Sequence, residues 1–158
     1  MKDTLRPGVS RTSRITVDRD RTIAFMGEEA RVYATPRLIS DVEMTCRNLM
    51  IEHSDEGEDS VGVEVALKHL AATLMGSTVE ITVTVTVVDR RKVVFEVAAK
   101  DEIDRISAGT HTRFVVNLDK RIEALRAKVA KLAKNEVSLC ELCPLGAFAR
   151  NRLIKASM

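Results

Sequence analysis

Aromatic residues are scarce in this sequence, which has no tryptophan, one tyrosine and four phenylalanines among 158 residues. A core built from it must be aliphatic, and we expect few aromatic side chains on which the bases of single-stranded nucleic acid could stack. No charge of one sign dominates either, with 25 basic and 23 acidic residues. That balance argues against a dedicated nucleic-acid or membrane-surface protein. No apolar run approaches the roughly 18 residues of a transmembrane helix. We therefore expect no nucleic acid and no membrane as partner.

Cysteine is also rare, and its use predicts a reducing compartment. The three cysteines are an odd number without a regular framework, and the N-terminus has no apolar signal-peptide core. We expect a soluble cytoplasmic protein. Cys140 and Cys143 have the spacing of half a zinc or redox site, but a second such pair is missing. Inert thiols are the expectation, with a metal site shared between subunits as the alternative. Nothing in the pattern requires a cofactor.

The clearest helix is predicted from Pro36 to about His53. Thr35 suits the N-cap and Pro36 the first helical position. Apolar residues recur with a period of about 3.6 and mark one buried stripe; they are Leu38, Ile39, Val42, Cys46, Leu49 and Met50. Glu43 falls at the edge of this stripe and not on the opposite face.

Period-two alternation predicts a run of antiparallel strands after this helix. Short strands are expected at 13–17 and 22–25, with an irregular segment at 26–34. Longer ones are expected at 61–69, 79–87, 93–99 and 110–118, with a short one near 103–107 and a hairpin joining 79–87 to 93–99. In the strand 61–69, strict alternation places Val61, Val63, Val65, Leu67 and His69 on one face and Gly62 on the other.

One long helix followed by many strands is an α+β layout, in which a curved antiparallel sheet wraps around one central helix. This is the hot-dog fold, expected over residues 1–119. Residues 120–158 are expected to form a C-terminal helical extension, with an amphipathic helix of about four turns marked by Ile122, Leu125, Val129 and Leu132. Its simplest role is to pack on the domain or on a partner subunit; contact with nucleic acid through its basic side chains is the remaining alternative.

Three polar residues stand where apolar ones would be ordinary. Thr35 has a simple explanation as a helix cap, Glu43 as a solvated flank residue, and His69 as a hydrogen-bonded core histidine. Together, a hydroxyl, a carboxylate and an imidazole supply the parts for acyl-transfer chemistry. Spacing alone does not establish that the three side chains meet.

The sequence resembles the fluoroacetyl-CoA thioesterase family of hot-dog proteins. The likeness covers roughly residues 5–120 and includes Thr35 and Glu43 followed by SVGVEVALKH (60–69), GSTVEITVTV (76–85) and SAGTHTRFVV (107–116). The resemblance implies that Thr35, Glu43 and His69 form a catalytic trio and that Gly62 and Arg113 contact the substrate. By residue type alone, Gly62 is equally a strand kink or bulge, and Arg113 a solvated sheet residue.

The activity implied is hydrolysis of an acyl-CoA thioester to free acid and CoA. Glu43 would attack the carbonyl or deprotonate a water, Thr35 would orient it, and His69 would relay a proton and bind substrate. The alternatives are a non-catalytic acyl-CoA-binding or sensor domain and a hot-dog hydratase, which would need a closely spaced Asp and His. A homodimer or higher homo-oligomer is expected, because the resemblance implies two subunits paired into one sheet and because a long β-branched strand such as 79–87 would be a risky open edge if unpaired. The acyl group stays open.

Overall fold

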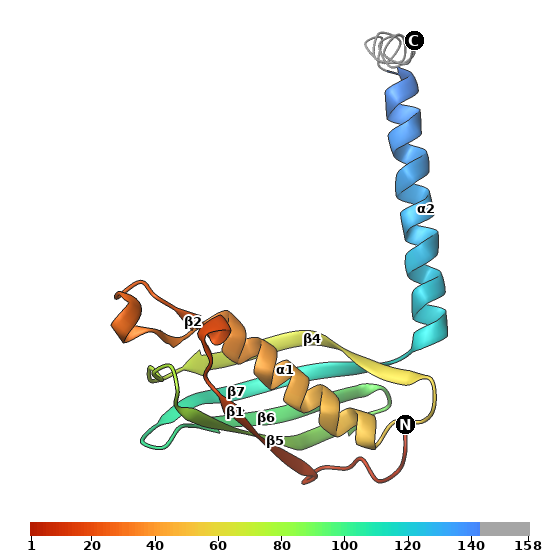
Figure 1. The fold of residues 1–158 in the computed structure, drawn as a ribbon. Helices are drawn as coiled ribbons and strands as arrows, with labels where there is room; N and C mark the ends of the chain where they lie inside the picture. Colours follow the sequence, from red (N-terminus) through yellow and green to blue (C-terminus); the bar gives the residue numbers. More distant parts are fainter. Residues whose placement is uncertain (143–158) are drawn as a thin grey trace, which may run out of the picture. The chain divides into compact units, whose positions relative to one another are not determined.

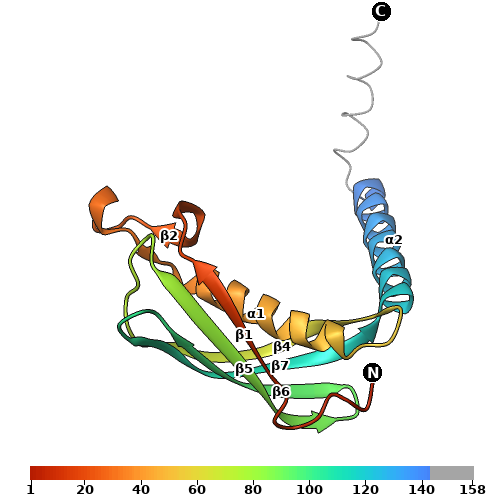
Figure 2. The same cartoon turned by 60° about the horizontal axis from the view of Figure 1, so that its bottom comes forward.

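The computed structural model describes the backbone of residues 1–142 and the side chains of residues 1–133. Five antiparallel strands form one curved sheet in the order β1-β5-β6-β7-β4. Their bounds are β1 Ser10–Thr16, β4 Glu58–His69, β5 Thr78–Asp89, β6 Lys92–Lys100 and β7 Arg105–Asn117. The helix α1, Thr35–Glu52, lies across the concave face of this sheet (Figures 1 and 2). The α+β hot-dog prediction and the β5–β6 hairpin are confirmed.

Two local predictions were wrong. The segment expected to be irregular contains the 3-10 helix Glu28–Ala30 and the strand β3, Val32–Tyr33, which pairs with β2, Thr22–Ile23. The break expected between 107 and 110 is absent, because β7 runs without interruption. Gly109 allows this: a Cβ there would lie 2.0 Å from the carbonyl oxygen of Ala66 on β4, so only glycine permits the two backbones to approach this closely.

The core between α1 and the sheet is aliphatic, as the composition requires. Alternate residues of β5 and β6 point towards α1 and are buried; they are Val79, Ile81, Val83, Val85, Val93, Phe95, Val97 and Ala99. The predicted stripe on α1 covers them, with Leu38, Val42, Cys46, Leu49 and Met50 buried. Removing one such side chain would cost about 2–5 kcal/mol of stability, so the position of α1 on the sheet is firmly determined.

The beginning of α1 differs from the prediction by one residue. Ala34 is the N-cap, with no side-chain capping hydrogen bond, and Thr35 is already inside the first turn. Pro36 follows it in that turn, where a missing N–H leaves no hydrogen bond unmade. The hydroxyl of Thr35 is therefore not used to cap the helix and is available to another partner.

The two edge strands of the sheet are β1 and β4, and β5 is not an edge strand. β5 pairs with β1 on one side and with β6 on the other, so strand 79–87 is not unpaired and the condition under which it would be a risky edge does not arise. β4 pairs with β7 alone among the described residues, and its Val63 and Val65 are 57% and 39% exposed. An exposed edge with β-branched residues is a surface that favours pairing with another strand.

A β-bulge in β4 changes which residues share a face. The pairing with β7 shifts register between Gly62 and Glu64, so Val63 is the extra residue. Gly62 then lies opposite Arg113, and His69 lies opposite Ser107, two β7 positions that point to the same side of the sheet. The prediction that Gly62 and His69 lie on opposite faces is therefore wrong: both point towards α1.

The helix α2, Leu118–Leu142, belongs to a second unit that begins at Leu118, the first unit being Met1–Asn117. It is longer than the four turns expected. Its apolar stripe, Leu118, Ile122, Leu125, Val129 and Leu132, is exposed along its whole described length. The packing of this stripe on a partner stays a prediction. No helix in the described part of the chain is long and apolar enough to cross a membrane.

Candidate functional site

Thr35 and His69 form a hydrogen-bonded pair at one end of α1. Thr35 comes from the first turn of the helix and His69 is the last residue of β4. Thr35 Oγ1 and His69 Nδ1 are 2.8 Å apart. The ring of Tyr33 meets the imidazole edge-on, with centroids 6.4 Å apart and planes at 79°, which fixes the orientation of the ring. The structure therefore brings together two of the three residues that the resemblance identified.

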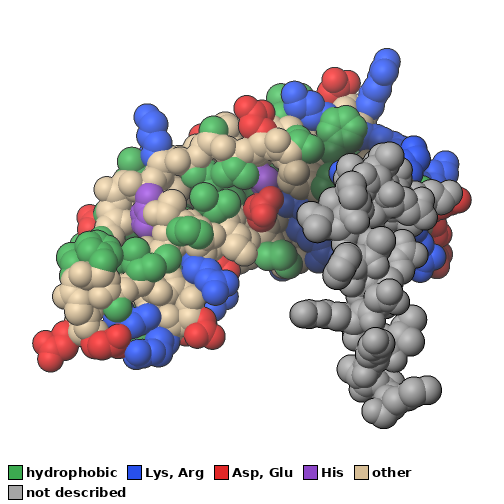
Figure 3. All heavy atoms as spheres, turned by 90° about the horizontal axis from the view of Figure 1, so that it is seen from above, with side chains coloured by type: hydrophobic (Ala, Val, Ile, Leu, Met, Phe, Trp, Pro, Cys, Tyr) green, Lys and Arg blue, Asp and Glu red, His purple; other side chains and the backbone are tan. Residues whose placement is uncertain are grey.

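This pair lies on the wall of a hollow of about 320 Å³ that is mainly apolar. Ile23, Phe25 and Leu70 contribute to its lining, and all three side chains are well exposed to it or to solvent. Hydrophobic side chains gather in the same region of the surface as histidine in the space-filling view (Figure 3). A hydroxyl and an imidazole beside apolar walls suit a ligand that is apolar apart from one reactive polar group.

Burial lowers the pKa of His69 from its usual value, because desolvation disfavours the charged imidazolium. The ring is therefore neutral at neutral pH. Its Nε2 is buried and has no hydrogen-bond partner among the described residues. The backbone of Ala71 also interacts with the ring and partly offsets the effect of burial on its pKa.

Glu43 lies elsewhere, over the β4–β7 part of the sheet. Its Oε1 is 3.6 Å from Nε2 of His111 and 3.7 Å from Nη1 of Arg113. A Cβ built on Gly62 would lie only 2.2 Å from the same oxygen. The absence of a side chain at Gly62 therefore makes room for the carboxylate, and the Glu43 side chain is still 40% exposed. One side of the carboxylate faces a fixed cation and the other is open.

Arg113 is buried beneath this carboxylate. Its guanidinium donates hydrogen bonds to Oγ and O of Ser60, at 2.9 and 2.8 Å, and to the carbonyl oxygen of Glu43 at 3.3 Å. Desolvation lowers the pKa of Arg113, but the group remains charged, because a guanidinium starts from a pKa far above neutral. A cation held in this way is a fixed positive charge beside Glu43.

The five predicted residues thus form two groups in one chain. Thr35 pairs with His69, and Glu43 gathers with Gly62 and Arg113. Thr35 and Glu43 are eight residues apart on α1, which corresponds to about 12 Å along the axis. One chain does not bring the carboxylate within hydrogen-bonding distance of the imidazole.

His111 was missed by the sequence reasoning. It is fully buried, 0% exposed, and lies two residues before Arg113 on the same face of β7. The signal was present in the period-two pattern, since residues 111, 113 and 115 must face α1 if Phe114 and Val116 face away. A histidine and an arginine facing a buried helix are unusual and point to a polar cluster.

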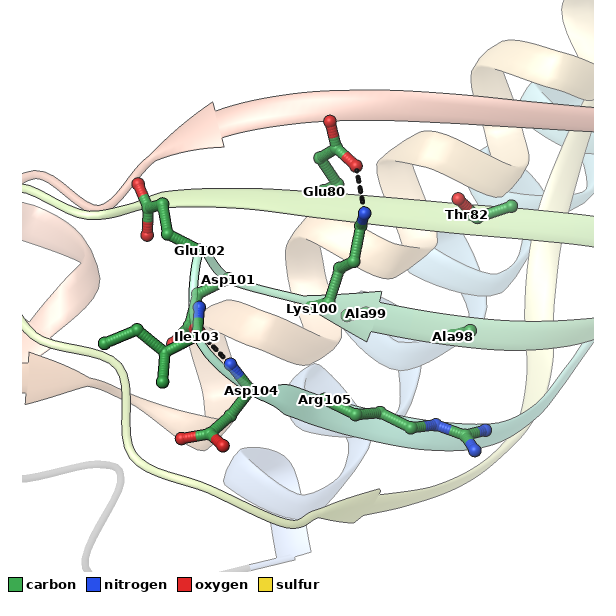
Figure 4. Close-up of a pocket in the computed structure, with 10 residues that line it drawn as sticks. All are labelled: Glu80, Thr82, Ala98, Ala99, Lys100, Asp101, Glu102, Ile103, Asp104 and Arg105. Carbon is green, nitrogen blue, oxygen red and sulfur yellow. Dashed lines mark hydrogen bonds and ion pairs between the residues drawn. The ribbon is translucent and has the colours of Figure 1, made fainter.

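A larger hollow, of about 420 Å³, lies at the end of β5 and β6 and holds none of these residues (Figure 4). Two of its charged side chains pair with each other, Lys100 with Glu80 at 3.1 Å. Oδ1 of Asp101 accepts hydrogen bonds from the backbone N–H groups of Ile103 and Asp104. The hydrogen bonds to Asp101 stabilise the β6–β7 turn.

Among the residues that the structure describes, no three His, Cys, Asp or Glu side chains lie close enough to hold a metal ion. The side chain of Cys140 and all of Cys143 lie outside the described residues. Cys46 is buried within α1, and burial raises its pKa to about 12. Its thiol is therefore protonated and unreactive at neutral pH.

Comparison with known proteins identifies the family. Residues 17–119 match the family described as fluoroacetyl-CoA-specific thioesterase. The fluoroacetyl-CoA thioesterase of Streptantibioticus cattleyicolor is 32% identical over 135 residues, a match that covers 81% of this chain and 97% of the relative.

Solved structures agree. A structure of the fluoroacetyl-CoA thioesterase superposes with a TM-score of 0.73 at 31% identity, covering 80% of this chain and 98% of the other. A thioesterase superfamily member from Thermus thermophilus has the same TM-score of 0.73 at 25% identity, covering 82% of this chain and 96% of that one. The chain therefore belongs to the fluoroacetyl-CoA-specific thioesterase family, whose members share the hot-dog fold and hydrolyse thioesters.

Proposed function

We propose that this protein hydrolyses an acyl-CoA thioester to the free acid and CoA, with Glu43 as nucleophile or base and Thr35 and His69 as its partners. The observation that carries the proposal is the 2.8 Å hydrogen bond between Thr35 and His69 on the wall of an apolar hollow. Family membership supplies the class of bond that is broken. A hydroxyl hydrogen-bonded to a neutral imidazole beside an open apolar surface contributes little to the stability of the fold, which favours a functional role for the pair.

The chemistry needs a nucleophile, a site for the developing oxyanion and a fate for the leaving thiolate. The Glu43 carboxylate attacks the thioester carbonyl, or it takes a proton from an attacking water. The C–S bond then breaks and the CoA thiolate leaves. Where Glu43 has attacked directly, water then hydrolyses the acyl–Glu43 anhydride, which releases the free acid and restores the carboxylate. Thr35 orients the attacking group, and Nε2 of His69 faces the reacting atoms and passes a proton between water and the products. The backbone N–H of Gly62 is available to the oxyanion, since no side chain blocks its approach.

The separation of the two groups supports a homodimer with composite sites. If β4 pairs with β4 of a second copy in an antiparallel manner, a two-fold axis brings the end of one strand beside the start of the other. His69 of the second copy then approaches the Glu43–Gly62 group of the first. Each chain contributes one half of each of two identical sites.

The side chains of β4 favour one register. With the two-fold axis through Ala66, Val65 lies opposite Leu67 of the partner subunit and Glu64 lies opposite its Lys68. In this register the Val63 bulge sets Gly62 opposite the partner's His69, on the face towards α1. Opposite charges and apolar pairs across two strands each contribute about 0.2–1 kcal/mol. The Val65–Leu67 pair and the Glu64–Lys68 pair each occur twice in a symmetric dimer.

The test is turnover of a panel of acyl-CoAs, with the released thiol detected by a thiol-reactive dye. Glu43→Gln should lower kcat by about 10³-fold, because an amide is neither a base nor a nucleophile. Glu52→Gln is the matched control on the same helix, since Glu52 pairs with Arg11 at the surface. A wild-type chain that binds acyl-CoA without releasing thiol would identify a sensor domain, and an active Glu43→Gln would refute the assignment of Glu43.

A further inference from the structure

His111 is enclosed between β4, β7 and α1, and both of its ring nitrogens have partners. Nδ1 is 2.8 Å from the backbone carbonyl oxygen of Glu64 on β4, and Nε2 is 3.2 Å from Nη1 of Arg113. Phe95 of β6 lies beside it in the sheet. No atom of the imidazole reaches solvent, since the residue is 0% exposed. Such a group touches neither substrate nor bulk water.

The chemistry of its two neighbours determines its protonation. A carbonyl oxygen only accepts hydrogen bonds, so Nδ1 must carry the proton. A guanidinium only donates, so Nε2 must offer its lone pair. His111 is therefore the neutral tautomer with hydrogen on Nδ1. Burial and the nearby Arg113 both lower its pKa, burial having the larger effect, and so favour this neutral form.

This arrangement leaves Arg113 with little freedom. One hydrogen of Nη1 goes to Nε2 of His111 and the other to the carbonyl oxygen of Glu43, while Nε and Nη2 are held by Ser60. The same Nη1 is the guanidinium nitrogen that lies 3.7 Å from the Glu43 carboxylate. The lone pair of His111 thus determines where the cation stands relative to the acid.

We infer that His111 is a positioning residue, which acts through Arg113 to hold the Glu43 carboxylate in place over Gly62. The inference rests on the proposed function of Glu43. It gives the two histidines of the site different tasks: His69 is exposed to the hollow and has an unpartnered Nε2, whereas His111 has both nitrogens engaged. A proton relay through His111 is not available, because its Nε2 lone pair is used by Arg113 and Oε1 of Glu43 is 3.6 Å away.

Two substitutions separate the two hydrogen bonds of His111. In His111→Asn the amide nitrogen replaces Nδ1 and still donates to Glu64, but nothing accepts from Arg113. In His111→Gln the longer side chain carries its amide oxygen to the position of Nε2 and restores the acceptor for Arg113. We expect kcat to fall about 10-fold or more in His111→Asn, with KM changed less than about threefold, because a small misplacement of a reacting group slows chemistry more than binding.

His111→Gln should keep kcat within about threefold of the wild type, since Arg113 again has its acceptor. His53→Gln is the control, because the His53 side chain bonds to Thr4 at the surface, outside the Glu43–Arg113 group. Thermal unfolding is measured for every variant. If His111→Asn and His111→Gln lose kcat equally, or only in proportion to lost stability, the residue is merely structural and the inference is overturned.

The outcomes also distinguish this inference from the proposed function. Failure of the wild type to release thiol, or full activity of Glu43→Gln, would remove the function on which the inference depends. Wild-type turnover abolished by Glu43→Gln, together with an unimpaired His111→Asn, would leave the function standing and refute the role of His111. A third readout needs no activity: nitrogen NMR of the folded chain at neutral pH should show Nε2 of His111 unprotonated, and a protonated Nε2 would refute the tautomer.

Discussion

The composite site predicts that two inactive variants restore each other. Glu43→Gln removes the carboxylate from one half of the site, and His69→Ala removes the imidazole from the other. Each variant alone carries its lesion in both sites of its homodimer, so each should be close to inactive. In a mixed dimer both lesions fall in the same site, since one chain supplies Gln at position 43 and the other supplies Ala at position 69. The second site of that mixed dimer is intact.

The magnitude follows from the geometry and from symmetry. The Thr35–His69 pair and Glu43 are about 12 Å apart along α1 in one chain, far beyond a hydrogen bond, so a single chain cannot complete the trio by a side-chain rotation. Random re-association of equal amounts gives mixed dimers as about half of the total, each with one intact site of two. The mixture should therefore recover about one quarter of wild-type activity.

The assay is thiol release from an acyl-CoA after the two purified variants have been mixed, unfolded in urea and refolded together. A control mixture pairs Glu43→Gln with Arg113→Met, which damages the same half of the site. Both sites of that mixed dimer are defective, so it should recover nothing. Mass spectrometry of differently tagged chains verifies that mixed dimers have formed. No recovery in the first mixture, with mixed dimers present, would refute the composite site.

Three further predictions follow from individual contacts. Gly62→Ala places a Cβ at 2.2 Å from Oε1 of Glu43, so the carboxylate must move. We expect kcat/KM to fall about 10- to 100-fold, and an unchanged kcat/KM in a folded variant would contradict this steric clash. Tyr33→Phe removes a 2.6 Å hydrogen bond to Asp41 and should lower the free energy of unfolding in urea by about 1–2 kcal/mol, whereas an unchanged midpoint would show that the bond contributes nothing. Burial lowers the pKa of His111, so unfolding releases a group that binds a proton more readily than in the native state. The contribution of His111 to stability should therefore be fully present above the ordinary histidine pKa of 6.5 and be lost as the pH falls below it, through the lowered pKa of the native state. This loss should be shallower in His111→Gln, and equal slopes would indicate that His111 does not contribute.

Much of the fold could be predicted from the sequence because local pattern and tertiary burial agree. The alternation is regular in β6 and in β5 as far as Val85, where a bulge interrupts it, and the same residues that alternate are those that pack on α1. Where a tertiary contact determines the conformation, the local pattern failed. The continuous β7 depends on the close approach of Gly109 to Ala66, and the edge position of β4 depends on strand order, which no local pattern encodes.

The residues of the candidate site were proposed from their types and from the resemblance, but their arrangement in space could not be predicted from the sequence. Strict alternation put Gly62 on the wrong face, since a bulge at Val63 is invisible to a period-two pattern. Thr35 was interpreted as a helix cap. Its residue type suits a cap as well as it suits the hydrogen bond to His69 that the structure shows. His111 escaped attention because a single histidine in a strand acquires meaning only from the Arg113 and Glu43 that the fold brings to it.

The open edge of β4 connects the stability of this protein with its chemistry. Edge strands are usually protected by charges and bulges that discourage pairing with other chains. β4 has both, in Glu64, Lys68 and the Val63 bulge, and yet it exposes Val63 and Val65. Most registers of a second strand would place Glu64 or Lys68 opposite an apolar residue. The register centred on Ala66 pairs the two charges with each other, and it is also the register that sets the partner's His69 opposite Gly62. The features that disfavour indiscriminate pairing therefore favour the one pairing in which the proposed site is complete.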